Sequence, residues 1–307
     1  MYDLVIIGGG PGGIAGGVYA ARKKLKTALI AESFGGQSIT SADIQNWIGT
    51  QSISGFDLAK NLENHLRAQR GLEIIDGDLV IKVEKINNGF SVATQQGKIL
   101  ETKTILICSG SRHRKLGILG ERELDGKGVA YCSTCDAPLF SDKTVAVIGA
   151  GNAGLEAVRD LLSYAEKVYM LVRSEKIKGD PLTFDQIKSD QRVEIIYNAE
   201  AKEIFGQQFV TGLAYLDKPS NEMKKLELSG VFIEVGSMPN AEFLGDLVQK
   251  TPYSEIIVNA VNQQTSQLGI WAAGDVTMSP YRQNNISAGD AVKAILNIQE
   301  YLNGNRS

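Results

Sequence analysis

Apolar residues at the start of the chain predict a strand, a helix and a second strand in immediate succession. Residues 3–7 form a short β-branched run, residues 14–24 read as an alanine-rich helix, and residues 26–30 read as the second strand. The same order recurs 141 residues further along the chain, over residues 144–148, 155–164 and 168–172. Alternation of strands and helices is typical of a parallel sheet, and the repeat predicts two such units.

The apolar pattern outside these two units adds further elements. Helical spacing predicts helices over residues 55–70 and 286–301. Alternating positions predict short strands over residues 72–106 and 193–232, separated by glycine and asparagine turns. We therefore expect extra strands beside each of the two repeated units.

A glycine-rich turn joins the first strand to its helix and fits the pattern G-x-G-x-x-G at Gly8, Gly10 and Gly13, with Pro11 inside it. The first glycine permits the tight bend, the second lets the backbone approach a pyrophosphate, and the third lets helix and strand pack closely. Glu32 follows the second strand, where a carboxylate can hold ribose hydroxyls. These residues predict a dinucleotide site; a glycine turn without a ligand is the alternative.

The second turn repeats this pattern, and its candidate ligand-binding residues are Gly149, Gly151, Asn152 and Gly154. The offset that relates the two turns also places Arg173 where the first unit has its carboxylate. A guanidinium suits a ribose 2′-phosphate, whereas a carboxylate suits free ribose hydroxyls. The two units therefore predict two different dinucleotides.

Two polar segments, residues 112–115 and 236–240, flank the second unit, and we expect them to be hinges. They predict a first domain made of residues 1–113 and 239–307, interrupted by an inserted domain at residues 114–238. The expected fold class is α/β, with two Rossmann-like, three-layer (ββα) domains, the second inserted in the first.

Composition narrows the class of protein. A length of 307 residues, with 43% hydrophobic and 22% charged residues, suits two globular domains. The net charge of −3 offers no basic surface, so nucleic acid is not an expected partner. No run of 18 apolar residues and no signal-like start occur, so we expect neither secretion nor a membrane span. Three cysteines, two of them closely spaced, suit a cytoplasmic protein.

Two of the three cysteines, Cys132 and Cys135, form a C-x-x-C pair that is followed at once by Asp136. When such a pair opens a helix, the free N–H groups favour the thiolate and lower the thiol pKa. An adjacent carboxylate could deliver a proton to the leaving sulfur during disulfide exchange. The segment therefore predicts redox chemistry.

Other interpretations of the cysteines are weaker. A zinc site needs about four ligands, and only Cys108, His65 and His113 remain, none at paired spacing. A purely structural disulfide would close a very short loop and does not suit a reducing compartment. Cys108 lies inside an apolar strand, so we interpret it as a small core residue.

Residues 269–275 read as a buried strand that ends in Gly274 and Asp275. A carboxylate at the end of such a strand could bind the hydroxyls of a sugar-alcohol chain. A plain turn before the following helix is the alternative.

The motifs together closely resemble the low-molecular-weight, bacterial-type thioredoxin reductases and the reductase portion of the alkyl hydroperoxide reductase flavoprotein. The resemblance covers essentially the whole chain. Besides the two glycine turns and the dithiol, the residues that it identifies as cofactor-binding are Gly35, Gly36, Gln37, Asn46, Gly110, Gly274, Asp275, Arg282 and Gln283.

The resemblance implies FAD in the first domain and NADPH in the inserted domain that carries the dithiol. Electrons would pass from NADPH to flavin, to the Cys132/Cys135 disulfide, and on to thioredoxin or a thioredoxin-like protein. By the same resemblance Cys135 would lie next to the flavin, Cys132 would attack the partner, and Asp136 would serve as acid/base. It also implies a homodimer and a rotation between the two domains.

Details at residues 34–37, 131–132 and 138–140 look more like the hydroperoxide-reductase branch. Members of that branch carry an N-terminal tandem thioredoxin-fold region. This chain starts at the first FAD strand, so we expect its partner to be a separate protein. A peroxiredoxin system is therefore the main alternative to thioredoxin.

The electron donor is where the chain departs most from the family. NADPH-specific members carry a His-Arg-Arg cluster and a further Arg, whereas this chain has Val172, Arg173, Ser174 and Lys178 there. Position 172 is a valine, whereas a member that prefers NADH would have a carboxylate side chain there. We expect NADPH to be preferred over NADH by a modest margin. NADH and reduced ferredoxin are the alternatives, and the second glycine turn argues against ferredoxin.

Two other classes of protein share parts of this pattern. A flavin-binding redox sensor would interact without turnover, and a ferredoxin–NADP reductase has a similar architecture but lacks the dithiol. We therefore interpret the chain as an enzyme that reduces disulfides.

Overall fold

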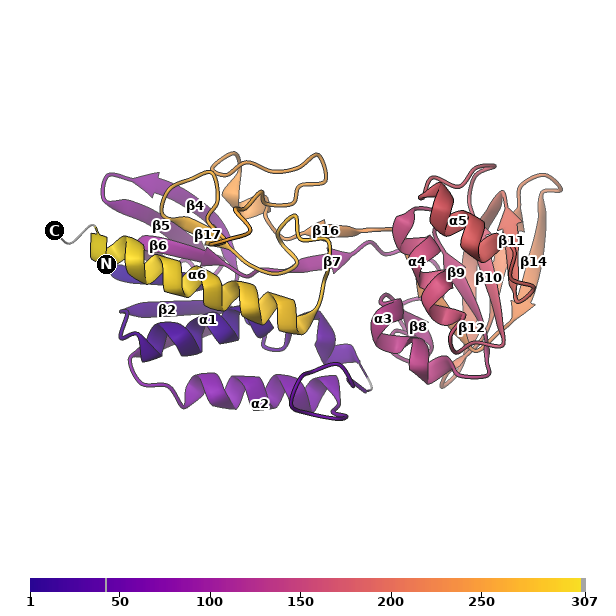
Figure 1. Cartoon of the computed structure of the whole chain (residues 1–307), viewed down its shortest axis with the longest axis horizontal. Coiled ribbons are helices and arrows are strands. Elements are labelled where there is room, and N and C mark those ends of the chain that lie inside the picture. Colours follow the sequence, from indigo (N-terminus) through magenta and orange to yellow (C-terminus); the bar gives the residue numbers. More distant parts are fainter. Residues whose placement is uncertain (42, 305–307) are drawn as a thin grey trace. The chain divides into compact units, whose positions relative to one another are not determined.

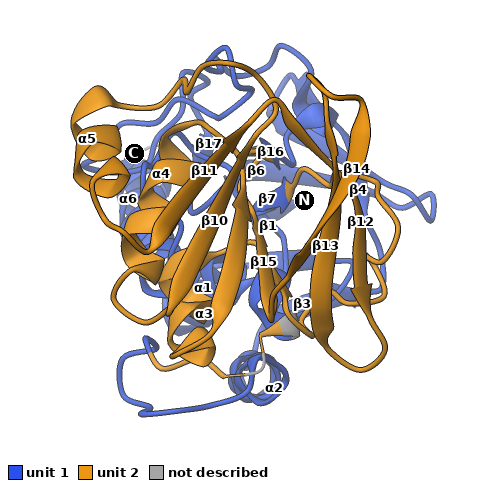
Figure 2. Cartoon of the chain, turned by 90° about the vertical axis from the view of Figure 1, so that its right-hand side faces the viewer, with its two compact units in different colours: residues 1–39, 46–112, 238–307 blue, residues 40–45, 113–237 orange. Residues whose placement is uncertain are grey.

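The computed structural model describes residues 1–41 and 43–304. The chain divides into two compact units (Figure 2), and the second is inserted in the first. Unit 1 consists of Met1–Ile39, Asn46–Arg112 and Met238–Ser307, and unit 2 of Thr40–Gln45 and His113–Ser237. The boundaries expected after residues 113 and 238 differ from these by one residue. The expected α/β fold with Rossmann-like domains is confirmed.

Unit 1 is built on a seven-stranded sheet with the order β3-β2-β1-β6-β5-β4, in which β17 also pairs with β6. Strands β3, β2, β1, β6 and β17 pair in parallel, whereas β5 pairs antiparallel with both of its neighbours, β6 and β4. The strands are β1 (Tyr2–Ile7), β2 (Thr27–Ala31), β3 (Leu72–Asp76), β4 (Val80–Ile86), β5 (Gly89–Thr94), β6 (Ile99–Ile107) and β17 (Ile270–Ala272).

The helices of unit 1 are α1 (Pro11–Arg22), α2 (Gly55–Arg67) and α6 (Asn284–Gly304), with the short 3-10 helices η1 (Gly36–Thr40) and η3 (Glu242–Leu244). Helices α1 and α6 pack side by side against the sheet (Figure 1). Trp271 of β17 is fully buried in this layer, and its indole Nε1 donates a 3.0 Å hydrogen bond to Asn297. The last strand and the last helix are thereby fixed to each other.

Unit 2 contains a five-stranded parallel sheet with the order β11-β10-β9-β15-β8 and a three-stranded antiparallel sheet, β12-β13-β14. The parallel strands are β8 (Val129–Ala130), β9 (Thr144–Ile148), β10 (Lys167–Val172), β11 (Val193–Tyr197) and β15 (Gly230–Ile233). The antiparallel strands are β12 (Ala199–Gly206), β13 (Val210–Asp217) and β14 (Glu222–Glu227).

The helices of unit 2 are α3 (Ser133–Asp136), α4 (Asn152–Leu161) and α5 (Pro181–Lys188), with the 3-10 helix η2 (Ala137–Phe140). One hydrophobic core joins the parallel sheet to these helices, and a second joins it to the antiparallel sheet. Unit 2 thus has the expected three layers. Helix α5 was not predicted; it begins after Asp180, whose side chain caps it, and has proline in its first turn.

The repeat seen in the sequence is a structural repeat. Each unit forms a strand, a glycine turn, a helix and a parallel strand. A Cβ atom on Gly13 would lie 1.9 Å from the carbonyl oxygen of Gly8, and one on Gly154 would lie 2.4 Å from that of Gly149. Any larger residue would separate helix from strand, which explains the third glycine of each motif.

The two connections between the units are β7 (Ser111–His113) and β16 (Ser237–Pro239), and they form a two-stranded sheet. β16 lies within the segment expected to be a hinge at residues 236–240, and β7 overlaps the one expected at residues 112–115 but begins one residue before it. In residues 1–41 and 43–304, no helix combines the length and the apolar character needed to cross a membrane.

Candidate dinucleotide and dithiol sites

The first glycine turn leaves a helix end open to a ligand. Gly10 precedes α1 without a side-chain cap, and Pro11 occupies the first turn. The first N–H groups of a helix have no partners within it and favour anionic groups. A Cβ on Gly10 would meet nothing closer than the Cα of Gly36, at 3.8 Å. The backbone is therefore open on this side, as close approach of a pyrophosphate requires.

Other predicted residues lie at the same edge of the sheet. The register pairs Ile7 with both Ile30 and Ile107, so the turns after β1, β2 and β6 are adjacent. Glu32 follows β2 and is exposed, and Gly110 follows β6 with a φ of +67°. This edge is formed by the carboxyl ends of parallel strands, which is where dinucleotides bind in this kind of sheet.

The side-chain hydrogen bonds that Asp275 makes with the described residues are long. The Gln37 amide nitrogen and the Ser287 hydroxyl each donate to its carboxylate across 3.5 Å. Burial raises the pKa of Asp275, although Arg282 and Ser287 oppose the rise. Because hydrogen bonds to a carboxylate are normally shorter, this group can still accept closer bonds from ligand hydroxyls. The surroundings fit the ribityl chain of a flavin.

The predicted residues Asn46 and Gln283 meet directly. The Asn46 amide donates a 3.1 Å hydrogen bond to Gln283, and Asn285 donates a 2.7 Å bond to the Asn46 carbonyl. These contacts attach the loop before α2 to the start of α6. Arg282 instead forms a 3.0 Å ion pair with Glu255. Sequence reasoning missed Asn285, because its role depends on a partner 239 residues away.

The turn of unit 2 shows the same open geometry. Gly151 precedes α4 without a side-chain cap, and a Cβ there would have no other atom within 4 Å. The Asn152 side chain accepts a 2.8 Å hydrogen bond from the Asp180 amide, and the Lys178 amide donates a 2.8 Å bond to Ala150. Asn152 thus holds the loop at residues 178–180 beside the turn.

Arg173 follows β10 directly, and the side chains of Arg173 and Lys178 are exposed. The Arg173 guanidinium makes no ion pair with the residues that the structure describes. The positions predicted to select the second dinucleotide therefore present free cationic groups.

Cys132 and Cys135 are joined by a disulfide, with their Cα atoms 5.4 Å apart. Cys132 precedes α3, and the Asp136 amide donates a 3.1 Å hydrogen bond to its carbonyl oxygen. The Ser133 hydroxyl between the cysteines donates a 2.9 Å bond to Asp160 of α4. The sulfurs and the carboxyl group thus share one short helical turn that is anchored to the next helix.

Asp136 is half-buried, and the environment perturbs its titration. Burial raises the pKa of Asp136 to about 6, although a hydrogen bond from Ser41 opposes the rise. That bond is long, with 3.5 Å between the Ser41 hydroxyl and the carboxylate. A carboxyl group with this pKa can both release and take up a proton near neutral pH. Nothing in the local sequence identified Ser41.

Tyr131, immediately before the dithiol, connects it to the first part of unit 2. Its hydroxyl donates a 2.9 Å hydrogen bond to the buried Glu121, its ring stacks on His113, and the Lys115 ammonium lies 3.8 Å from its ring centroid. Burial raises the pKa of the Tyr131 phenol, and the bond to Glu121 adds to the rise. The burial of Glu121 was not predicted, because a glutamate among polar residues is normally exposed.

Cys108 is buried beneath α1 in unit 1, as expected of a core residue. Burial raises the pKa of its thiol, and the charge of Asp290 adds to this effect. A thiol of this kind is unreactive. Across residues 1–41 and 43–304, no group of three or more His, Cys, Asp and Glu side chains is placed to hold a metal ion.

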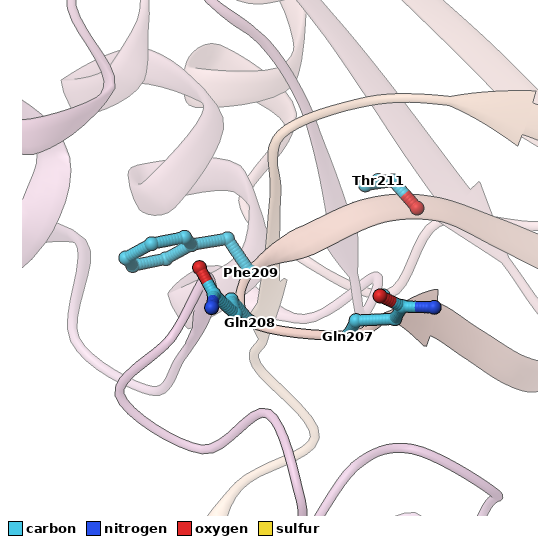
Figure 3. Close-up of a pocket in the computed structure, with 5 residues that line it drawn as sticks. Gln207, Gln208, Phe209 and Thr211 are labelled. Carbon is cyan, nitrogen blue, oxygen red and sulfur yellow. The ribbon is translucent and has the colours of Figure 1, made fainter.

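An open hollow at the turn between β12 and β13 contains none of the predicted site residues (Figure 3). It is lined by Gly206, Gln207, Gln208, Phe209 and Thr211. Figure 3 shows the Gln208 amide close to the Phe209 ring, while Gln207 points the other way. The lining carries no charged group or sulfur, so it offers nothing to redox chemistry.

Residues 2–293 match the family described as "Pyridine nucleotide-disulphide oxidoreductase". The chain belongs to this family. It is 38% identical over 301 residues to a protein named NADH dehydrogenase from Bacillus subtilis, and 40% identical over 305 residues to a component of alkyl hydroperoxide reductase from Pseudomonas aeruginosa. Each match covers 98% of this chain but only 58% of the relative, so the chain spans less than two thirds of their length.

Solved structures of thioredoxin reductases match this chain along nearly all of their length. Thioredoxin reductase from Streptococcus pyogenes is 32% identical, with a TM-score of 0.92 and 99% of both chains covered. Thioredoxin reductase from Giardia duodenalis is 28% identical, with a TM-score of 0.91 and 98% of both chains covered. The resemblance expected from the motifs, to bacterial-type thioredoxin reductases and to the hydroperoxide reductase flavoprotein, is confirmed.

Proposed function

We propose that the chain is a flavin-dependent disulfide reductase. Electrons pass from NADPH through FAD to the Cys132–Cys135 disulfide, and from the dithiol to the disulfide of thioredoxin or a similar small protein. The observation that carries this proposal is the disulfide in one helical turn with Asp136, whose pKa is raised to about 6. The two open glycine turns supply the sites for the two dinucleotides.

FAD would supply the group that accepts a hydride from the nicotinamide and passes two electrons to the disulfide. In unit 1 the turn at residues 8–13 would hold its pyrophosphate, Glu32 its ribose, and Asp275 its ribityl chain. Four glycines around this region have positive φ angles, a backbone conformation that other residues rarely adopt: Gly35, Gly36, Gly110 and Gly274.

The dithiol would act by thiol–disulfide exchange. The Cys132 thiolate attacks the partner disulfide, which forms a mixed disulfide and releases one partner thiolate. The Cys135 thiolate then attacks the Cys132 sulfur, which closes the intramolecular disulfide and releases the second partner thiolate. Asp136 delivers a proton to a leaving sulfur, and its raised pKa keeps part of the population protonated near neutral pH.

NADPH is the proposed donor. Arg173 and Lys178 are exposed cations beside the second turn, and Val172 offers no carboxylate to hold a 2′-hydroxyl. Arg173→Ala should raise KM for NADPH and leave KM for NADH nearly unchanged, because NADH has no 2′-phosphate. Equal effects on both cofactors would indicate that Arg173 only supports the fold.

A second candidate is reduction of a peroxiredoxin system, with NADH as the donor. It is favoured by the names of the curated relatives, one a component of alkyl hydroperoxide reductase and the other NADH dehydrogenase. The dithiol chemistry would be the same in both cases. Only the donor and the protein that receives the electrons would differ.

The family resemblance also favours a homodimer, which sedimentation of the FAD-loaded protein would test. We propose a cytoplasmic location, because in a reducing compartment a C-x-x-C disulfide is catalytic rather than structural.

Steady-state oxidation of NADPH and NADH, each with thioredoxin or with a peroxiredoxin plus hydroperoxide, tests the proposed function. The proposal expects the fastest turnover with NADPH and thioredoxin. Turnover only with NADH and the peroxiredoxin would favour the second candidate. Flavin reduction without turnover on any disulfide would contradict both.

A further inference from the structure

Segments that are far apart in the sequence meet behind Arg173. The Lys218 ammonium donates a 3.0 Å hydrogen bond to the Arg173 carbonyl oxygen. The Asn198 amide donates a 3.2 Å bond to the Ser174 carbonyl, and the Lys218 amide donates a 3.1 Å bond to the Asn198 carbonyl. Lys218 is thus held against the Arg173 loop through both its main chain and its side chain.

We propose that Lys218 is a second cationic determinant of NADPH specificity, beside Arg173. The inference rests on the proposed function and adds to it a residue that lies 45 positions away, after β13. An ammonium has three donors, and one of them is used on the Arg173 carbonyl. The side chain is 39% exposed and its ammonium also lies 3.5 Å from the Glu200 carboxylate, so donor capacity remains beside the loop whose guanidinium would bind the 2′-phosphate.

Glu200 competes for the same ammonium. Its carboxylate lies 3.5 Å from the Lys218 nitrogen and also forms an ion pair with Lys202. The hydrogen bond from Lys202, and then the charges of Lys202 and Lys218, lower the pKa of Glu200, so this carboxylate is ionised at neutral pH. Glu200 therefore weakens the positive field available to a phosphate, and its removal should strengthen phosphate binding.

Lys224 provides a matched control. It lies on β14, the neighbouring strand, and its ammonium pairs with Asp217. Replacing Lys224 removes a single positive charge, as replacing Lys218 does, from the edge of the β12-β13-β14 sheet. Lys224 itself takes no part in the hydrogen bond between Lys218 and the Arg173 carbonyl.

The test is isothermal titration calorimetry of the full chain with 2′,5′-ADP and with 5′-AMP, at low ionic strength. These probes differ in the 2′-phosphate and report binding without flavin turnover. Lys218→Gln should weaken binding of 2′,5′-ADP about threefold to fivefold, the upper part of the roughly 1.4-fold to 5-fold range for an exposed ion pair, and leave 5′-AMP unchanged. Glu200→Gln should tighten 2′,5′-ADP about twofold, and Lys224→Gln should change neither ligand.

Equal weakening of both ligands by Lys218→Gln would overturn the assignment, because it would make Lys218 a support for the loop. Unchanged affinity for 2′,5′-ADP in that variant would overturn it as well. If the unmodified chain bound 2′,5′-ADP no better than 5′-AMP, the NADPH preference itself would fail, and the role of Lys218 with it. A preference that is lost in Arg173→Ala but kept in Lys218→Gln would refute Lys218 alone.

Discussion

The main-chain amide of Asp136 donates a 3.1 Å hydrogen bond to the carbonyl oxygen of Cys132. This single bond closes the helical turn that holds both cysteines and the carboxyl group. Since the turn is also anchored through Ser133 to Asp160, the acid and the sulfurs keep a fixed relation.

Cys132→Ser and Cys135→Ser should each abolish disulfide reduction, because exchange needs both sulfurs, and should leave flavin reduction by NADPH intact. Stopped-flow flavin bleaching and steady-state turnover, measured on the same preparation, separate the two steps. Cys108→Ser is the control and should retain turnover, because that thiol is buried in unit 1. Turnover in either dithiol variant would show that electrons leave by another route.

Asp136→Asn should change how stability depends on pH. The folded-state pKa of about 6 lies above the ordinary value of 3.8, so the folded state binds this proton more tightly than the unfolded state. The free energy of unfolding therefore falls as pH rises through the interval from about 4 to 6, and this loss levels off once both states are ionised. Asparagine does not ionise, so the variant should not lose this stability, and its free energy of unfolding at pH 8 should exceed that of the unmodified protein by roughly 2–3 kcal/mol.

Thermal unfolding of the oxidised proteins at pH 4 and pH 8 measures this difference. The two proteins should have similar Tm values at pH 4 and diverge at pH 8. The variant should also lose turnover by about a hundredfold, because a proton donor is missing. A constant difference in Tm across this range would mean that Asp136 does not titrate in it.

Asp275→Ala should weaken retention of FAD by about tenfold or more, which is the effect of losing a hydrogen bond to a charged group. The ratio of absorbance at flavin and protein wavelengths, followed through dialysis, measures this retention. Asp246→Ala removes an exposed carboxylate of the same unit and should retain flavin fully. Full retention in the Asp275 variant would show that the ribityl assignment is wrong.

Gly151→Ala should weaken NADPH binding while leaving the stability of the fold nearly unchanged. The new methyl group would have no protein atom within 4 Å, so the free energy of unfolding should fall by less than about 1 kcal/mol. The methyl would occupy the side from which a pyrophosphate approaches, so NADPH should bind more weakly while FAD is retained. Gly154→Ala, in contrast, should destabilise unit 2 itself, because its Cβ would collide with Gly149. Unchanged NADPH affinity in Gly151→Ala would place the cofactor elsewhere.

The sequence predicted those parts of the fold that depend on the residue types within one short segment. The glycine turns require specific residues at fixed spacing, so Gly8 and Gly149 located both repeated units. The helix expected from residue 14 begins at Pro11, because glycines weaken an apolar pattern while a proline in the first turn suits a helix start. Helix α5 carried a usable signal in its Asp180 cap and the following proline.

Other features depend on contacts between distant segments and could not be read from one stretch of sequence. Glu121 is buried only because Tyr131 and two main-chain amides surround it. Lys218 matters only because β13 ends beside Arg173. The segment at residues 40–45 belongs to unit 2 although its neighbours in sequence belong to unit 1. Tertiary packing decides each of these cases.

Anaerobic titration of the FAD-loaded protein with NADPH tests the central claim most directly, when flavin absorbance and accessible thiols are followed together. We predict that NADPH bleaches the flavin and that two new thiols appear per chain, both absent in Cys135→Ser. NADH at the same concentration should act more slowly. Bleached flavin without new thiols would contradict electron transfer to the Cys132–Cys135 disulfide, and flavin that neither nucleotide reduces would contradict the proposed donor.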